Sequence, residues 1–119
     1  MSYEQYEEVP ALMEVLAEPN RRLILDLLRD GERPVGQLVG ALDVSQPAVS
    51  KHLRILRDAG LVEVRASGQQ RLYRLQPEGL RELDEWLAPY RAMWAGHLDA
   101  LERLVDTLPA EPTERVETS

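Results

Sequence analysis

The sequence predicts a mainly α-helical domain with one small β-hairpin. Apolar residues recur at intervals of three and four through most of the chain, which is the period of a helix with one buried face. Prolines and glycines stand where such segments would begin and end. Only residues 61–66 and 70–75 are rich in strand-forming residues, and residues 67–69 between them supply a turn. At 119 residues, the chain has the length of a single domain.

Three helices are expected in the N-terminal part. Residues 3–17 form the first, and Pro10 lies either in its first turn or at a kink. Pro19 starts the second helix, whose apolar stripe continues to a stop at Gly31. Pro34 starts a short third helix. Because proline lacks a backbone donor, it is tolerated in the first turn of a helix and therefore indicates a helix start.

A fourth helix follows after a tight turn. Ser45 is placed to cap its N-terminus, Pro47 lies in its first turn, and Gly60 ends it. The hairpin comes next, and a last helix then extends to residue 108. A short helix, a tight turn, a longer helix and a β-hairpin in this order are typical of a winged helix-turn-helix.

The fourth helix carries a polar side that is suited to DNA. At about 100° per residue, Val49, Leu53 and Leu56 form one narrow apolar side. The opposite side offers an amide, a hydroxyl and three cations, and no acid occurs before Asp58. Such groups bond base edges in the major groove, and the cations also bond phosphates. The alternative is an amphipathic helix whose polar side is basic by chance. The residues on this side are Gln46, Pro47, Ser50, Lys51, Arg54 and Arg57.

Two stretches resemble the ArsR (arsenic-repressor-like) family of bacterial regulators. Residues 45–75, SQPAVSKHLRILRDAGLVEVRASGQQRLYRL, are similar to its recognition helix and wing, and residues 16–31, LAEPNRRLILDLLRDG, to its second helix. The resemblance covers roughly residues 9–76 and implies a homodimeric repressor that binds a palindromic operator in double-stranded DNA, with helix 45–58 in the major groove. It also implies that Arg54 and Arg57 contact phosphates. By position, the residues that face DNA are Ser45, Gln46, Pro47, Ser50, Lys51 and His52.

His52 has a second interpretation. It lies at the edge of the apolar side of the helix, where a packed or capping side chain is the alternative to a contact with bases.

The hairpin is the expected wing. Leu72 and Arg74 share one of its faces, whereas Arg71 and Tyr73 share the other. We expect Arg65 and Arg71 to bind phosphates, which positions the protein without selecting a sequence. The alternative is an exposed sheet edge whose charges prevent aggregation.

The C-terminal helix has a heptad pattern that is typical of a helix packed on another helix. A small domain cannot cover so wide a stripe, so we expect a homodimer in which the N-terminal segment, 1–18, takes part. Pro89 is expected to kink or split the helix. Residues 1–108 thus form one domain, with the DNA-binding core and wing at 19–76 and a dimerisation helix at 77–108. The expected interface residues are Leu80, Leu83, Leu87, Tyr90, Trp94, His97, Leu101 and Leu104.

A metal sensor of the thiolate type is excluded because the chain has no cysteine. The short third helix, where members of the resembled family place metal-binding cysteines, carries no metal ligand either. The resembled family has a second type of metal site, which uses Asp and His residues from the C-terminal helices of both subunits. His97 with Asp99 or Glu102 is the only remnant of such a site here. We therefore expect no metal and no cofactor. His97 is expected in the dimer interface, where it would make dimerisation pH-sensitive. A pocket for a small apolar effector, or plain core, would be formed by Trp86, Tyr90, Met93 and Trp94.

The net charge of −7 is a first argument against nucleic acid, but the charge is unevenly distributed. Residues 19–75 contain ten basic and six acidic residues, which gives +4. Residues 1–18 carry −5 and residues 76–119 carry −6. A basic module therefore lies between acidic flanks, unless solvated helix faces differ in sign by chance.

Several other classes of protein are disfavoured. An enzyme is disfavoured because the sequence has no cysteine, no glycine-rich phosphate loop and no paired carboxylates outside exposed helix faces. No apolar run approaches the roughly 18 residues of a membrane span, and the N-terminus is unlike a signal peptide, so we expect a cytoplasmic protein. Residues 109–119 have two prolines and three glutamates and are expected to form a disordered acidic tail. The remaining alternative function is a winged-helix protein-interaction module without specific DNA binding.

Overall fold

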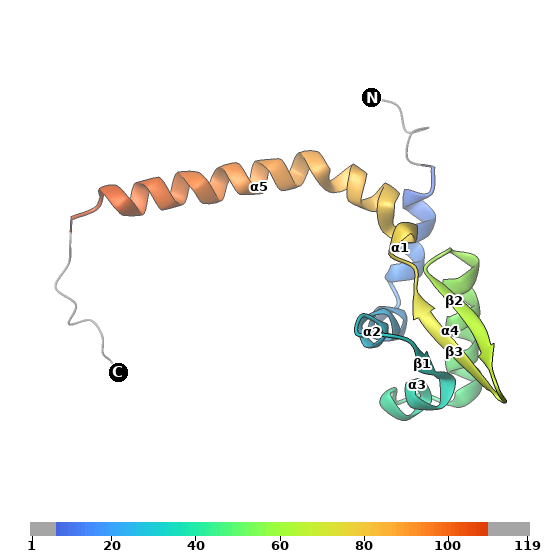
Figure 1. Cartoon of the computed structure of the whole chain (residues 1–119). Coiled ribbons are helices and arrows are strands. Elements are labelled where there is room, and N and C mark those ends of the chain that lie inside the picture. Colours follow the sequence, from blue (N-terminus) through green and yellow to red (C-terminus); the bar gives the residue numbers. More distant parts are fainter. Residues whose placement is uncertain (1–6, 110–119) are drawn as a thin grey trace. The chain divides into compact units, whose positions relative to one another are not determined.

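The computed structural model describes residues 7–109, and its elements follow the predicted order (Figure 1). Residues 1–6 and 110–119 lie outside the described residues, and they include residues 3–6 of the predicted first helix and all of the predicted tail except residue 109. The chain divides into two compact units, residues 1–86 and 87–119. The elements are α1 (Val9–Leu16), α2 (Pro19–Leu28), β1 (Arg33–Pro34), α3 (Val35–Ala41), α4 (Gln46–Asp58), β2 (Val62–Ser67), β3 (Gln70–Leu75), the 3₁₀ helix η2 (Pro77–Leu80) and α5 (Arg81–Thr107).

The helix starts follow from caps and prolines. Pro10 lies in the first turn of α1 and does not kink it. The Glu18 carboxylate caps α2 by accepting a hydrogen bond of 2.7 Å from the Asn20 amide. The Ser45 hydroxyl caps α4 by accepting one of 3.3 Å from the Ala48 amide. Helix α2 ends at Leu28, three residues before the predicted stop at Gly31.

The sheet contains one strand more than predicted. The two-residue strand β1 pairs antiparallel with β3, so the strand order is β1-β3-β2. Strands β2 and β3 form the expected hairpin, with Ser67 opposite Gln70 around a two-residue turn. Tyr73 of β3 is 8% exposed and faces the core, while Arg74 next to it is exposed on the other face. This alternation confirms the predicted division of the hairpin faces.

A single apolar core holds the first unit together. Helices α2, α3 and α4 pack against the sheet. The three residues of the predicted apolar side of α4, Val49, Leu53 and Leu56, are 0%, 1% and 0% exposed. Each large apolar side chain buried in this way stabilises the fold by about 1.5–3 kcal/mol. Within residues 7–109 no polar or charged side chain is buried, so the core is held by apolar packing alone.

Helix α5 differs from the other α-helices because it has no buried residue. It runs without a break through Pro89, so the proline does not split it. Leu80 and Leu83, at the start of the predicted stripe, pack against the core of the first unit. No helix within the described part of the chain is both long and apolar enough to cross a membrane. Trp86 and Leu87 are partly buried. The large apolar side chains that follow along α5 and at its end are 45–62% exposed, and they are Tyr90, Met93, Trp94, Leu98, Leu101, Leu104, Val105 and Leu108.

A close backbone approach between the end of α4 and η2 gives a prediction for Gly79. A Cβ atom at this position would lie 2.2 Å from the Gly60 carbonyl oxygen and 2.9 Å from Leu61 Cδ2. We therefore expect Gly79→Ala to lower the free energy of unfolding by about 1–3 kcal/mol through overpacking, as measured by urea denaturation. Gly36→Ala is the control, since a Cβ on this helical glycine meets no atom within 4 Å. Equal stability of the two variants would contradict the close approach.

Candidate DNA-binding surface

The polar side of α4 faces solvent because its apolar side fills the core. The predicted DNA-facing residues of the helix are all exposed except His52, and Ser45 is exposed at the cap. We call the exposed set the α4 polar face. It comprises Gln46, Pro47, Ser50, Lys51, Arg54 and Arg57.

The cations of the α4 polar face have no acidic partner among the residues that the structure describes. Among residues 7–109, Lys51, Arg54 and Arg57 form no ion pair within 4.0 Å. The first acid on the helix is Asp58, its last residue. Three positive charges on one helix side are therefore available to a polyanion.

The wing arginines fall into two groups. Arg65 donates to both carboxylate oxygens of Glu32, from Nη2 at 2.6 Å and from Nε at 3.1 Å. These hydrogen bonds hold the pKa of Glu32 below its usual value and raise the pKa of Arg65. Arg74 is paired with Glu63, directly across the hairpin, and both its Nε and its Nη2 approach the same carboxylate oxygen, Oε2. Phosphate binding by Arg65 stays a prediction, and a phosphate would have to compete with Glu32 for the guanidinium.

Arg71 is the wing arginine that has no acidic partner in the part of the chain that the structure describes. It is exposed near the tip of the hairpin, opposite Ala66. It forms no ion pair with any other residue of the described part, 7–109. Since it shares a hairpin face with Tyr73, it lies on the face that turns toward the helices, away from Arg65 and Arg74. The structure thus brings Arg71, but not Arg65, to the helix side of the wing.

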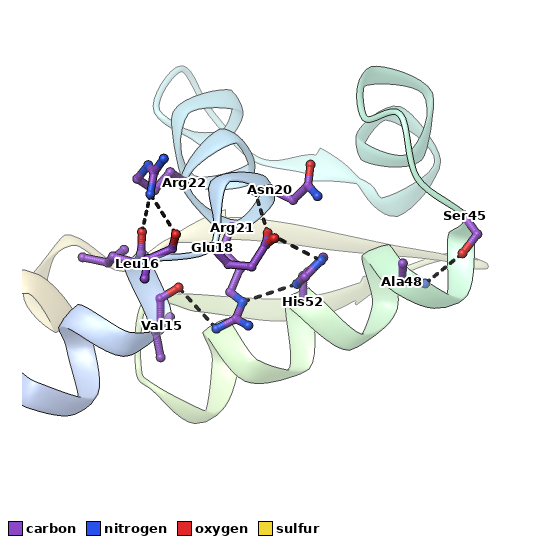
Figure 2. A network of polar contacts seen from close by, with 10 residues as sticks. Val15, Leu16, Glu18, Asn20, Arg21, Arg22, Ser45, Ala48 and His52 are labelled. Carbon is purple, nitrogen blue, oxygen red and sulfur yellow. Dashed lines mark hydrogen bonds and ion pairs between the residues drawn. The ribbon is translucent and has the colours of Figure 1, made fainter.

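His52 is placed differently from its neighbours on α4 (Figure 2). Its side chain is 14% exposed. Its Nδ1 accepts a hydrogen bond of 3.3 Å from Arg21 Nε, and its Nε2 lies 3.9 Å from Glu18 Oε1. The structure therefore gives His52 a packed position against the start of α2, which is the second of the two interpretations considered for it.

Arg21, Glu18 and Glu32 are contact residues that the sequence does not reveal. Arg21 reaches His52 across 31 residues, and Glu32 reaches Arg65 across 33. Local spacing carries no signal for contacts at such separations.

The expected metal and effector residues lie on α5 and at its start. In the described residues there is no group of three or more His, Asp or Glu that could hold a metal ion. Tyr90, Met93 and Trp94 are 45–57% exposed, so they do not form core within the single chain. Trp86 is partly buried and belongs to the first unit.

Comparison with known proteins agrees with this geometry. The family described as "Bacterial regulatory protein, arsR family" matches residues 18–64. The HTH-type transcriptional regulator Rv2034 of Mycobacterium tuberculosis is 37% identical over 102 residues, which cover 86% of this chain and 92% of the relative. The biofilm growth-associated repressor of Agrobacterium fabrum is 40% identical over 80 residues, covering 67% of this chain and 68% of the relative.

The fold is shared with solved structures as well. An ArsR-like transcriptional regulator from Rhodococcus sp. RHA1 superimposes with a TM-score of 0.69 at 28% identity, covering 92% of this chain and all of that one. The names of these proteins are those of transcriptional regulators and not of enzymes. The chain belongs to the ArsR family of bacterial regulatory proteins.

Proposed function

We propose that the chain is a sequence-specific repressor that binds a palindromic operator in double-stranded DNA as a homodimer. One observation carries this proposal. The α4 polar face is exposed, bears three unpaired cations within the described residues, and stands on a fully buried apolar side. An α-helix of this kind fits the major groove, where amide, hydroxyl and cationic groups bond base edges.

The residues of the α4 polar face divide into two roles in this proposal. Gln46 and Ser50 contact bases near the N-terminal end of the helix, where Pro47 lies between them and Ser45 caps the first turn. Lys51, Arg54 and Arg57 bind phosphate or guanine. Arg71 on the wing binds flanking backbone. The chain acts in the cytoplasm, where operator DNA lies.

The homodimer of the proposal forms along α5. Its exposed apolar stripe, described above from Tyr90 to Leu108, carries a heptad pattern on one side of a helix. These eight large apolar side chains form a larger exposed apolar patch than a helix in water normally carries. Such patches mark association sites. Two recognition helices held about 34 Å apart then meet successive turns of the major groove.

The proposal is tested with DNA from the promoter of the chain's own gene. Fluorescence anisotropy with this duplex and with a shuffled duplex gives the two affinities. We expect a Kd near the nanomolar range for the promoter duplex and much weaker binding to the shuffled one. Both affinities should fall steeply as the salt concentration rises from about 50 to 200 mM. Micromolar binding without preference would instead support the protein-interaction module.

Substitutions on the α4 polar face provide a residue-level prediction. Lys51→Ala and Arg54→Ala should each weaken promoter binding by about 1–3 kcal/mol, because each removes a cation that bonds guanine or phosphate. If the bond is to phosphate, the slope of log K against log salt should also fall by about 0.9 for each phosphate released. Arg103→Ala removes the same charge from α5 and is expected to bind like the wild type. Failure of either α4 variant to dimerise would mean that this side of the helix is wrongly assigned.

The dimer interface gives a separate prediction. Leu101→Glu places a charge in the exposed apolar stripe and should produce monomers in sedimentation velocity experiments. Ala92→Glu is the matched control, because nine residues are two and a half turns of helix and place the new charge on the opposite side. An unchanged dimer in the Leu101 variant would place the interface elsewhere.

A further inference from the structure

Three helices of the first unit meet at a small polar junction on the inner side of α4 (Figure 2). Arg21 of α2 donates from Nε to His52 Nδ1 at 3.3 Å and from Nη1 to the Val15 carbonyl oxygen of α1 at 3.2 Å. Glu18 Oε1 caps α2 and lies 3.9 Å from His52 Nε2. We call Val15, Glu18, Arg21 and His52 the helix junction.

The helix junction is the directional contact of α4. Within residues 7–109, no other side chain of α4 has a hydrogen bond or ion pair to another element. The remaining inner residues are apolar, and apolar packing has no preferred direction. A hydrogen bond, in contrast, weakens steeply when its angle is distorted. Among the movements of α4, the His52 contact therefore restricts most directly the rotation of the helix about its own axis.

Small rotations of α4 matter for DNA binding. A rotation of about 10° moves a side-chain tip that lies about 6 Å from the helix axis by about 1 Å. Hydrogen bonds to base edges tolerate only about 0.5 Å in donor–acceptor distance. Hydrogen bonds between Gln46 or Ser50 and bases would thus break while long cationic side chains still reach phosphates. Rotation of α4 changes sequence preference more than total affinity.

We propose that Arg21 and His52 are positioning residues that fix the rotation of α4 and thereby set its preference for operator sequence. This inference rests on the proposed function. Neither residue needs to touch DNA: His52 acts through the direction that it imposes on the α4 polar face, and Arg21 acts through His52.

The same arginine connects α4 to α1. The Val15 carbonyl oxygen at the end of α1 is bound by Arg21, and the next two carbonyl oxygens, of Leu16 and Ala17, are bound by Arg22 Nη1 at 2.7 and 3.2 Å. A displacement of α1 therefore reaches His52 through one guanidinium group. Since the N-terminal helix is expected to join the dimer interface, subunit association and the orientation of α4 are linked at this point.

The junction requires a neutral imidazole. Nδ1 of His52 accepts a hydrogen bond and so carries no proton, which leaves the proton on Nε2, the nitrogen that faces Glu18. The charged groups that face the ring are Arg21 of α2 and Glu18 at the α1–α2 connection, while its neighbours one turn away on α4, Ala48 and Leu56, are apolar. Protonation of Nδ1 would remove the acceptor and set two cations side by side.

The experiment measures the ratio of the affinities for promoter and shuffled duplexes at about pH 8 and about pH 5.5. In the wild type we expect the ratio to fall at least about threefold at the lower pH because the hydrogen bond breaks. Affinity for the shuffled duplex should stay constant or rise, because protonation adds positive charge. His52→Leu should show a low ratio at both pH values, reduced by about tenfold.

Two further variants separate positioning from a general loss of structure. In His52→Gln the side-chain oxygen can accept from Arg21 at every pH, so the ratio should exceed that of His52→Leu and be independent of pH. His97→Gln removes the other histidine of the chain, which is expected in the dimer interface, and shows how much of the pH dependence comes from dimerisation. Thermal unfolding followed by circular dichroism identifies any variant that does not fold, and the glutamine variant decides the question if the leucine variant fails.

The outcomes are distinguishable. A wild-type ratio in His52→Leu, or an undiminished pH dependence in His52→Gln, would overturn the positioning role and leave the proposed function intact. A pH dependence that is lost in His97→Gln and kept in His52→Gln would overturn it as well. A wild type without preference for the promoter duplex at either pH would overturn the proposed function itself.

Discussion

The burial of three side chains on one side of α4 sets the direction of every other side chain on that helix. Val49, Leu53 and Leu56 are almost completely removed from water. Because the helix cannot turn without exposing them, the opposite side must present its amide, hydroxyl and cations to solvent. The apolar side selects which face of α4 is exposed, and the contact at His52 fixes the small rotations of the helix that this burial still allows. The candidate site is thus a consequence of core packing.

Charge is used in two ways on this small domain. On the sheet, Arg65 and Arg74 are paired with Glu32 and Glu63, and these pairs join the α2–β1 turn to the hairpin and the two hairpin strands to each other. On α4, cations stand without acidic partners in the described residues. A positive surface therefore exists on a chain whose total charge is −7, because most of the acids lie in other segments and the one acid of α4, Asp58, is its last residue.

Most of the fold was predictable because it is specified locally. Proline, serine and glycine marked the starts and ends of helices, and the period of apolar residues identified the buried side of α4. Strand β1 was missed because two residues ending in a proline have no alternation to detect. The partners of His52 and Arg65 were missed because they lie more than 30 residues away, and their contacts exist only once the chain is folded. Leu80 and Leu83 fit the heptad of α5, yet they pack on the chain's own core.

The ion pairs of the sheet affect how salt titrations of this protein are interpreted. Both arginines are well exposed, at 58% and 61% of their side-chain surface, so dissolved ions screen these pairs readily. Added salt, which makes the release of counterions from DNA less favourable, would also loosen the connection between the hairpin and the α2–β1 turn. The measured slope of log K against log salt would then be steeper than the phosphate contacts alone produce. Only the difference in slope between two variants with an intact sheet counts phosphates, because the contribution of the hairpin cancels.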